Sequence, residues 1–344
     1  MLKISVSALP KLFAAIAATQ ELYLPVEKAD QVAFGKWEES ATVRLDALKT
    51  VKSAKDFFFP QTENMVGFKT AGKRIEIINT RNEISPFVMM GVRACDAASF
   101  AILDRVFLSD PVDTYYKNRR ENGTIITAAC SRPEETCFCN AFGIDATEPA
   151  GDVITWTQDD TMYWKAVTEK GEKLTAAIGD LLEDAGADGE AAVAQQKAAT
   201  KEILDKLPFA KLDLSNFGED KLLEIFNSPK WAKLSEACLG CGTCTFVCPT
   251  CQCYDIREFD TGNGIQRFRC WDSCMYSDFT QCAHGNPRTS QLERFRQRFM
   301  HKLVYYPANN DGIFSCVGCG RCLAKCPISM NIVKVAKALG GTQA

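Results

Sequence analysis

The sequence predicts an α/β (α+β) domain in its N-terminal half and a mainly helical domain with a long insert in its C-terminal half. The chain has 344 residues, and at about 150 residues per domain this length favours roughly two domains. The first half alternates short apolar runs with helical patterns, as α/β domains do. In the second half, 13 of the 17 cysteines fall within the last 107 residues.

Helix and strand patterns follow one another along the N-terminal half. The first is an amphipathic helix for which Ser7 is a suitable N-cap. Its apolar positions are Leu9, Leu12, Phe13 and Ile16. Continuous apolar runs bounded by turn residues indicate buried strands, and they occur at 86–91, 123–129 and 162–167. An amphipathic helix is predicted at 96–108, between the first two strands.

These patterns divide the chain into three parts. We expect the α/β domain at residues 1–170, a helical connector at 171–225 and the cysteine-rich domain at 226–344. The connector is rich in Ala, Glu, Asp and Lys, which favours exposed helices. Two cysteine runs in the last part leave 67 residues between them, at 249–315, and we treat this stretch as an insert.

Composition excludes several classes of function. Hydrophobic residues at 46% and charged residues at 24% are typical of globular proteins, not of collagen-like or disordered chains. A net charge of -3 is too small to favour nucleic acid as a partner. No apolar run reaches 18 residues, so no membrane span is expected. The apolar stretch after Lys11 is short for a secretory signal, and we expect a cytoplasmic protein.

Two cysteine runs in the C-terminal half share one spacing, C-x2-C-x2-C-x3-C-P. Their cysteines are Cys238, Cys241, Cys244 and Cys248 in the first run and Cys316, Cys319, Cys322 and Cys326 in the second. Bacterial two-cluster ferredoxins use this spacing to bind 4Fe-4S cubanes. The pattern therefore predicts a ferredoxin-like domain that binds two clusters.

In such ferredoxins the fourth cysteine of each run binds the cluster of the other run. We therefore assign one cluster to a first set, Cys238, Cys241, Cys244 and Cys326. The other cluster is assigned to a second set, Cys316, Cys319, Cys322 and Cys248. We expect the glycines within the runs to keep side chains away from the inorganic sulfides. Zinc is the alternative, but zinc sites usually draw their ligands from two separated pairs.

A third set of cysteines lies in the predicted α/β domain: Cys95, Cys130, Cys137 and Cys139. Cys95 and Cys130 follow the first two predicted strands, and the other two lie on the same side of an extended segment. Four thiols at strand ends would suit an additional iron–sulfur cluster. Alternatively, they pack as small apolar residues, and the spacing alone leaves both interpretations open.

Further motifs accompany these cysteines. They are Gly91-Val92-Arg93-Ala94-Cys95-Asp96, Cys137-Phe138-Cys139, Cys248-Pro249-Thr250-Cys251-Gln252-Cys253-Tyr254, Trp271-Asp272-Ser273-Cys274, His284-Gly285-Asn286-Pro287-Arg288 and His301-Lys302. Together with the two runs, they resemble the iron–sulfur subunit of anaerobic sulfite reductase, and they are similar to the related beta subunits of cytoplasmic sulfhydrogenases. The resemblance extends over most of the chain.

The resemblance implies an electron-transfer component of a cytoplasmic multi-subunit oxidoreductase of anaerobic metabolism. It implies two 4Fe-4S clusters and an additional cluster in the N-terminal domain, of the 4Fe-4S rather than the 2Fe-2S type. The implied partners are a flavoprotein subunit that binds NAD(P)H and a catalytic subunit of a sulfite reductase, hydrogenase or related complex. No catalytic residue is assigned to this chain. The alternative is a self-contained enzyme whose N-terminal cluster binds the substrate.

Five cysteines lie outside the three sets: Cys251, Cys253, Cys270, Cys274 and Cys282. Cys251, Cys253 and Cys274 fall at motif positions of the family and are possible iron ligands without an assigned cluster. The other two depart from the family pattern. One interpretation is a fourth cluster, and the other is thiols that pack near clusters or hydrogen-bond to them.

The insert is rich in basic residues, and Gly262-Asn263-Gly264 within it predicts a turn. The basic and aromatic residues are Arg267, Arg269, Trp271, Arg288, Arg294, Arg296, Arg298 and Lys302. In one interpretation these residues form a docking surface for an acidic partner. In a second interpretation they raise the reduction potential of a nearby cluster. In the third interpretation they lie on a solvated helix face, where Glu293 pairs with them.

The remaining polar candidates have structural interpretations. His284 and His301 have no second ligand beside them in the sequence, so we expect hydrogen-bonded structural residues. Arg93 and Asp96 flank Cys95 and either tune its cluster or, for Asp96, cap the following helix. No nucleotide-binding glycine motif occurs in the chain.

Overall fold

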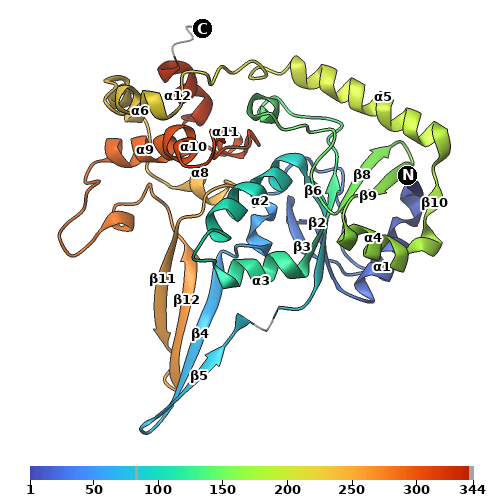
Figure 1. Ribbon diagram of the computed structural model, residues 1–344, viewed down its shortest axis with the longest axis horizontal. Coiled ribbons are helices and arrows are strands. Elements are labelled where there is room, and N and C mark those ends of the chain that lie inside the picture. The colour runs from blue at the N-terminus through green and yellow to red at the C-terminus, as the bar shows by residue number, and fades with distance from the viewer. Residues whose placement is uncertain (82–83, 341–344) are drawn as a thin grey trace.

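An eight-stranded mixed sheet forms the centre of the N-terminal half (Figure 1). The computed structural model describes residues 1–81 and 84–340. The strand order is β10-β1-β9-β8-β7-β6-β2-β3. The four strands from β8 to β2 in this order run parallel to one another, and the outer strands are antiparallel. The bounds are β1 Leu2–Ser5, β2 Glu21–Lys28, β3 Gln31–Lys36, β6 Phe87–Arg93, β7 Gly123–Ala128, β8 Val153–Gln158, β9 Thr161–Ala166 and β10 Glu183–Asp184.

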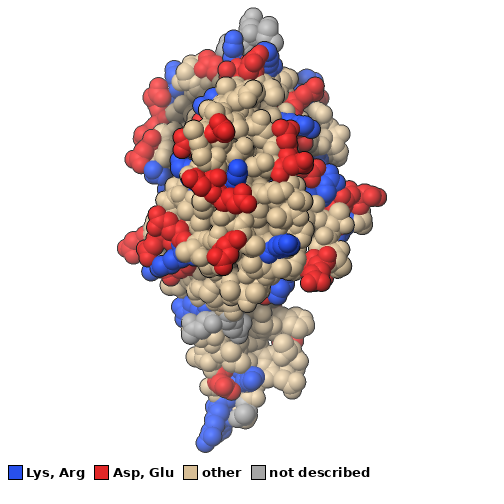
Figure 2. Space-filling view, turned by 90° about the vertical axis from the view of Figure 1, so that its right-hand side faces the viewer, with Lys and Arg blue, Asp and Glu red and all other residues tan. Residues whose placement is uncertain are grey.

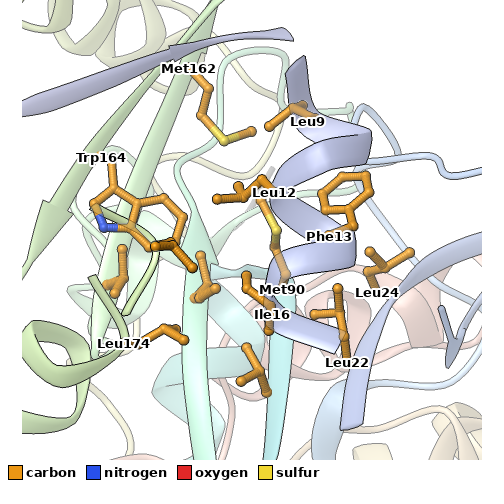
Figure 3. Close-up of a cluster of buried hydrophobic side chains, with 14 of the residues drawn as sticks. Leu9, Leu12, Phe13, Ile16, Leu22, Leu24, Met90, Met162, Trp164 and Leu174 are labelled. Atoms are coloured by element: carbon orange, nitrogen blue, oxygen red, sulfur yellow. The ribbon is translucent and has the colours of Figure 1, made fainter. Parts of the chain in front are cut away.

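Helix α1 (Leu9–Ala17) covers one face of this sheet. Figure 3 shows Leu12 and Ile16 of α1 pointing into a cluster of apolar side chains that includes Met90 of β6. The amphipathic helix predicted here is confirmed, but the predicted N-cap is wrong. Ser7 lies in a 3-10 turn just before the helix, and its backbone N–H donates to Ser5 Oγ at 3.3 Å.

Helices α2 (Ala94–Phe107) and α3 (Thr114–Asn122) cover the other face. Strand β6 is buried along its whole length. Its Met89 packs with Phe100 of α2, whereas Met90 faces α1. Because successive strand residues point to opposite faces, both faces must be apolar, and this explains the continuous apolar run in the sequence.

The other predicted elements of this half are confirmed with one difference in burial. The strands predicted at 86–91, 123–129 and 162–167 are β6, β7 and β9, and the helix predicted at 96–108 is α2. Strand β9 is buried on one face only, since Trp164 is buried while Lys165 is exposed. It is the third strand from the β10 edge of the sheet.

A second, four-stranded antiparallel sheet joins parts of the chain that are far apart in sequence. Its order is β11-β12-β4-β5, and in Figure 1 it projects from the body as an arm. The bounds are β4 Thr62–Ala71, β5 Arg74–Asn79, β11 Tyr254–Asp260 and β12 Gly264–Trp271. The turn predicted at 262–264 is confirmed, since it connects β11 to β12. The insert thus contains a β-hairpin as well as helices.

Short helices make up most of the remaining C-terminal half. They are α6 Leu222–Phe226, α7 Lys230–Ser235, α8 Thr243–Phe246, α9 Gln291–Met300, the π-helical turn η8 His301–Tyr305, α10 Tyr306–Ala308, α11 Arg321–Ala324 and α12 Ile332–Leu339. Trp231, Phe295 and Phe299 form the centre of their apolar core. Helices α8 and α11 lie within the two cysteine runs, and each begins after a glycine in the left-handed conformation.

Helix α4 (Glu169–Ala177) packs on the eight-stranded sheet through Leu174, and helix α5 (Gly186–Asp205) follows β10 and leads to the C-terminal half. Helix α5 runs along the outside of the molecule (Figure 1) and is anchored by Val193 and Leu204. Figure 2, which faces the right-hand side of Figure 1, shows acidic and basic side chains interspersed over this surface. Among the described residues, no helix is both long and apolar enough to cross a bilayer.

Candidate metal centres

The four thiols of the first set line one cavity. Three come from the segment around α8, and Cys326 comes from the second run, as the spacing predicts. Gln291 Nε2 donates to Cys238 Sγ at 3.4 Å. Cys241 is exposed, and Leu239 beside it is 66% exposed. The first set therefore lies at the protein surface.

The second set is also brought together by the fold. Its members are Cys316, Cys319 and Cys322 of the second run and Cys248 of the first. Burial raises the pKa of Cys316 to about 12 and raises that of Cys319 as well. The pKa of Cys248 is lowered, chiefly by the neighbouring Cys251 side chain. Burial thus keeps most of these thiols neutral unless a metal displaces the protons.

The third set lines a small cavity in the N-terminal half. Cys95 and Cys130 follow β6 and β7, which are adjacent parallel strands whose carboxyl ends meet at one edge of the sheet. Cys137 and Cys139 come from the loop after β7, and both are buried. Cys319 of the second set lines the same cavity. The third set and the second set are therefore neighbours.

The loops that carry these two sets pack backbone against backbone. The N–H of Phe138 donates to the carbonyl oxygen of Gly318 at 2.9 Å. Gly318 and Gly320 both have positive φ, of 57° and 75°. A Cβ at either position would overlap a carbonyl oxygen, that of Phe138 or that of Thr136. These glycines make room for the loop of the third set, a reason that differs from the one expected from the sequence.

A buried ion pair connects the same two sets. Arg321 lies two residues after Cys319 in the second run, and its Nη1 and Nη2 contact the two carboxylate oxygens of Asp96 at 2.5 and 2.8 Å. Both side chains are buried. Asp96 therefore lies inside the first turn of α2 and pairs with Arg321 rather than capping the helix, so the N-cap interpretation is wrong. Arg93 donates to the backbone carbonyls of Leu45, Ala47 and Ala129.

Three other cations are buried near the thiols: Lys55, Arg298 and Lys302, which are 1%, 3% and 3% exposed. Lys302 Nζ donates to Thr250 Oγ1 at 2.7 Å, and Lys55 Nζ donates to the carbonyl oxygen of Cys251 at 2.7 Å. In the described part of the chain, none of these three cations forms an ion pair with a carboxylate. The ion pairs that include a buried side chain are formed by other arginines. Burial acts to lower the pKa of Lys302 and Arg298, but the neighbouring cysteines outweigh this effect and the pKa of both groups is raised.

The insert's basic residues therefore do not share one role. Arg269 is 1% exposed and pairs with Glu63 and Asp113. Burial of Arg269, Arg298 and Lys302 contradicts both a docking surface and a solvated helix face for these residues. Glu293 does not pair with the arginines of its helix, because it forms a capping box with Ser290. For Arg298 and Lys302, the interpretation compatible with burial is positive charge close to a cluster.

Three of the five unassigned cysteines, Cys251, Cys253 and Cys274, lie near Lys302. The thiols of Cys253 and Cys274 are neighbours, and the thiol of Cys251 is a neighbour of that of Cys248. Cys270 lies on β12, where its charged neighbours are side chains of the arm. Cys282 is exposed and its thiol donates to a nearby carbonyl oxygen at 3.0 Å. Cys270 and Cys282 are therefore separate from the thiol groups.

The two histidines do not join these groups. His284 is exposed on a loop. His301 begins the π-helical turn η8, which also contains Lys302, and such turns occur frequently at functional sites. Burial lowers the pKa of His301 to about 4. The ring of His301 packs edge-on against Tyr306.

The donors present fit iron–sulfur clusters. Buried charges require compensation, and a cluster with thiolate ligands carries the negative charge that the three buried cations lack. Among the described residues, no three His, Cys, Asp or Glu side chains are close enough to hold a single metal ion. Zinc would hold its sulfur ligands about 3.8 Å apart, from Zn–S bonds of about 2.3 Å. Thiols that surround a cavity, as in the first set, suit a larger cluster.

Lys55 is a residue of the candidate site that the sequence interpretation missed. It precedes Phe57, Phe58 and Phe59, and this apolar run was a signal that the segment is buried. Phe58 and Phe59 belong to the core on the α2 face of the sheet. The partnership of Asp96 with Arg321 had no such local signal, because 225 residues separate the two.

Comparison with known proteins identifies related sequences. Residues 237–330 match the family model of a 4Fe-4S dicluster domain. The chain is 32% identical over 330 residues to sulfhydrogenase 2 subunit beta of Pyrococcus furiosus, and the match covers 95% of this chain and 94% of the relative. Comparison with solved structures finds no match.

Proposed function

The chain belongs to the family of sulfhydrogenase beta subunits, and on this basis we propose that it conducts electrons between two other subunits of an oxidoreductase complex. The family and the dicluster domain make it an iron–sulfur electron-transfer subunit. The number of clusters, their ligands and the partners are our proposal. We assign 4Fe-4S clusters to the first and second sets and an additional 4Fe-4S cluster to the third.

One observation carries this proposal: the three sets form a continuous series. Cys248 connects the first run to the second set. Cys319 of the second set lines the cavity of the third set, and their loops are hydrogen-bonded through Phe138 and Gly318. Electrons can therefore cross the protein from the surface near Cys241 to the N-terminal domain without leaving the chain.

The protein itself contributes the positions of the clusters and the charged side chains around them. The clusters supply the one-electron chemistry, and the chain sets where they lie and how easily they are reduced. The exposed first set supports contact with one partner at that surface. The resemblance of the sequence motifs supports a flavoprotein partner that binds NAD(P)H and a catalytic partner, in a cytoplasmic complex.

The test is anaerobic reconstitution of the full-length chain with iron and sulfide. Three cubanes contain about twelve irons and an equal number of inorganic sulfides. The reconstituted chain should bind at least this amount. We expect at least three paramagnetic centres on reduction, and no hydrogenase or sulfite reductase turnover by the chain alone. A folded, colourless protein would overturn the proposal, and so would full turnover by the isolated chain. No structural observation favours the self-contained enzyme, since the third set already offers four thiols.

A further inference from the structure

The trio formed by Cys251, Cys253 and Cys274 is not used by the proposed series of three clusters. We propose that the trio binds a fourth iron–sulfur cluster, held by three protein thiolates beside the second set. This proposal extends the proposed function, because it assumes that Cys248 is already a ligand of the second set.

The arm places Cys253 and Cys274 at the same end of its hairpin. Tyr254, the first residue of β11, pairs with Trp271, the last residue of β12. One step beyond this pair, the N–H of Asp272 donates to the carbonyl oxygen of Cys253 at 3.0 Å. Cys274 follows two residues later, is 8% exposed, and its thiol is a neighbour of the Cys253 thiol. The strand register therefore holds these two thiols together.

The third member is positioned by the first cysteine run. Cys251 lies three residues after Cys248, and the two thiols are neighbours. Its carbonyl oxygen accepts from Lys55 Nζ, and this ammonium also lies 4.0 Å from the centre of the Trp271 ring. Lys55 thus connects the segment of Cys251 to the end of β12. The trio lies at the junction of the arm and the ferredoxin-like domain.

Buried charge indicates what the trio binds. Burial lowers the pKa of Lys55, and negative charge on the neighbouring Cys251, Cys248 and Cys253 would counter this effect. Lys302 is also close to Cys248 and Cys251. Among the described residues, neither lysine has a carboxylate within ion-pair distance, although other buried cations, such as Arg269 and Arg321, do. Two buried ammonium groups beside neutral thiols would be uncompensated, whereas thiolates bound to a metal cluster supply the opposite charge.

The geometry favours a cluster over a single ion. Among the described residues, no three His, Cys, Asp or Glu side chains lie close enough together to hold one metal ion, and this includes the trio. With Cys248 committed to the second set, the trio offers three thiolates. Three thiolates fit a cluster of three irons, or a cubane whose fourth iron takes a ligand from outside the protein.

The first test is the metal content of the full-length wild-type protein after anaerobic reconstitution. Four clusters require about fifteen or sixteen irons per chain with matching sulfide, whereas three cubanes require about twelve. This measurement needs no variant and does not depend on whether a variant folds. A content near twelve irons, in a protein with its three other clusters complete, overturns the fourth cluster and leaves the proposed function intact.

The second test compares cysteine variants. Cys253→Ala and Cys274→Ala should each lose about three or four irons with matching sulfide and keep the signals of the other clusters. Cys270→Ala and Cys282→Ala are the matched controls and should lose none. Iron content unchanged in the first two variants overturns the proposal, as does stoichiometric zinc that these variants release. A wild-type protein with much less than twelve irons would instead overturn the proposed function.

Discussion

The two cysteine runs have the same spacing but lie in different environments. In the first run, Leu239 is 66% exposed and Cys241 is exposed. At the matching positions of the second run, Val317 is 2% exposed and Cys319 is 9% exposed. A hydroxyl hydrogen bond from Thr243 lowers the pKa of Cys241, whereas burial raises that of Cys319.

This difference shows that two runs with the same cysteine spacing need not have the same role. The first run faces solvent, where a partner can approach. The second run is enclosed by the N-terminal domain through Gly318, Gly320 and Arg321. In the proposed series of clusters, the first run would therefore be the terminus and the second run the interior connection. Each of the following substitutions compares matching positions to test this distinction.

The largest effect is expected from the cluster ligands. Cys319→Ala should lose about eight irons, because the third set packs against the second run, whereas Cys241→Ala should lose about four. Loss of a bound cluster also removes the folding free energy that it supplies. Iron and sulfide analysis with anaerobic thermal melting measures both effects. Equal losses in the two variants would show that the runs are equivalent.

Breaking the buried ion pair should have the next largest effect. Arg321→Met leaves Asp96 buried without its partner and should lower the free energy of unfolding by about 3 to 5 kcal/mol. Arg105→Met, which removes an exposed pair with Asp311, should cost no more than about 1 kcal/mol. Anaerobic denaturant unfolding of the cluster-loaded protein compares them. A small effect for Arg321→Met would mean that the contact between the sets does not stabilise the protein.

Matching glycines should differ for the same reason. Gly318→Ala combines left-handed strain with overlap at the Phe138 carbonyl and should cost roughly 2 to 5 kcal/mol. Gly240 has a similar φ of 67°, but its Cβ would meet the flexible side chain of Gln291. Gly240→Ala should cost about 1 to 2 kcal/mol, from strain alone. Unfolding of both loaded variants checks this, and the reverse order would contradict the assigned packing.

The smallest effect concerns cluster potential. Lys302 lies close to Cys248 and Cys316 of the second set. Lys302→Met should make the potential of that cluster more negative by roughly 90 mV, since a buried charge several ångströms away contributes about 2 kcal/mol. Lys325→Met, at an exposed position, is the control. Redox titration followed by electron paramagnetic resonance measures the shift, and an unchanged potential would remove the role given to Lys302.

Local patterns were enough to predict part of this molecule. The apolar run of β6 indicated a strand because Met89 and Met90 each face a hydrophobic layer. The repeated spacing of the cysteine runs indicated the first and second sets, because ligands so close in sequence leave few alternative arrangements. That Cys326 lines the cavity of the first set agrees with the prediction, although its role as a ligand stays a prediction.

Contacts between distant segments were beyond the sequence patterns. Nothing near Thr62 indicates that β4 pairs with β12, some two hundred residues later. The burial of Lys302 and Arg298 was missed for the same reason, because basic residues are normally exposed and the surrounding thiols come from other segments. The purpose of Gly318 became evident only when the loop of Phe138 was placed beside it.

The pairing of β4 with β12 limits how this protein can be divided. A fragment ending before the first cysteine run would leave β4 with a bare edge of unpaired N–H and carbonyl groups, and such edges promote aggregation. A fragment beginning at that run would leave β12 equally bare. The ferredoxin-like part therefore cannot be excised or exchanged by itself. Any engineered transfer of this part has to include the hairpin formed by residues 62–79.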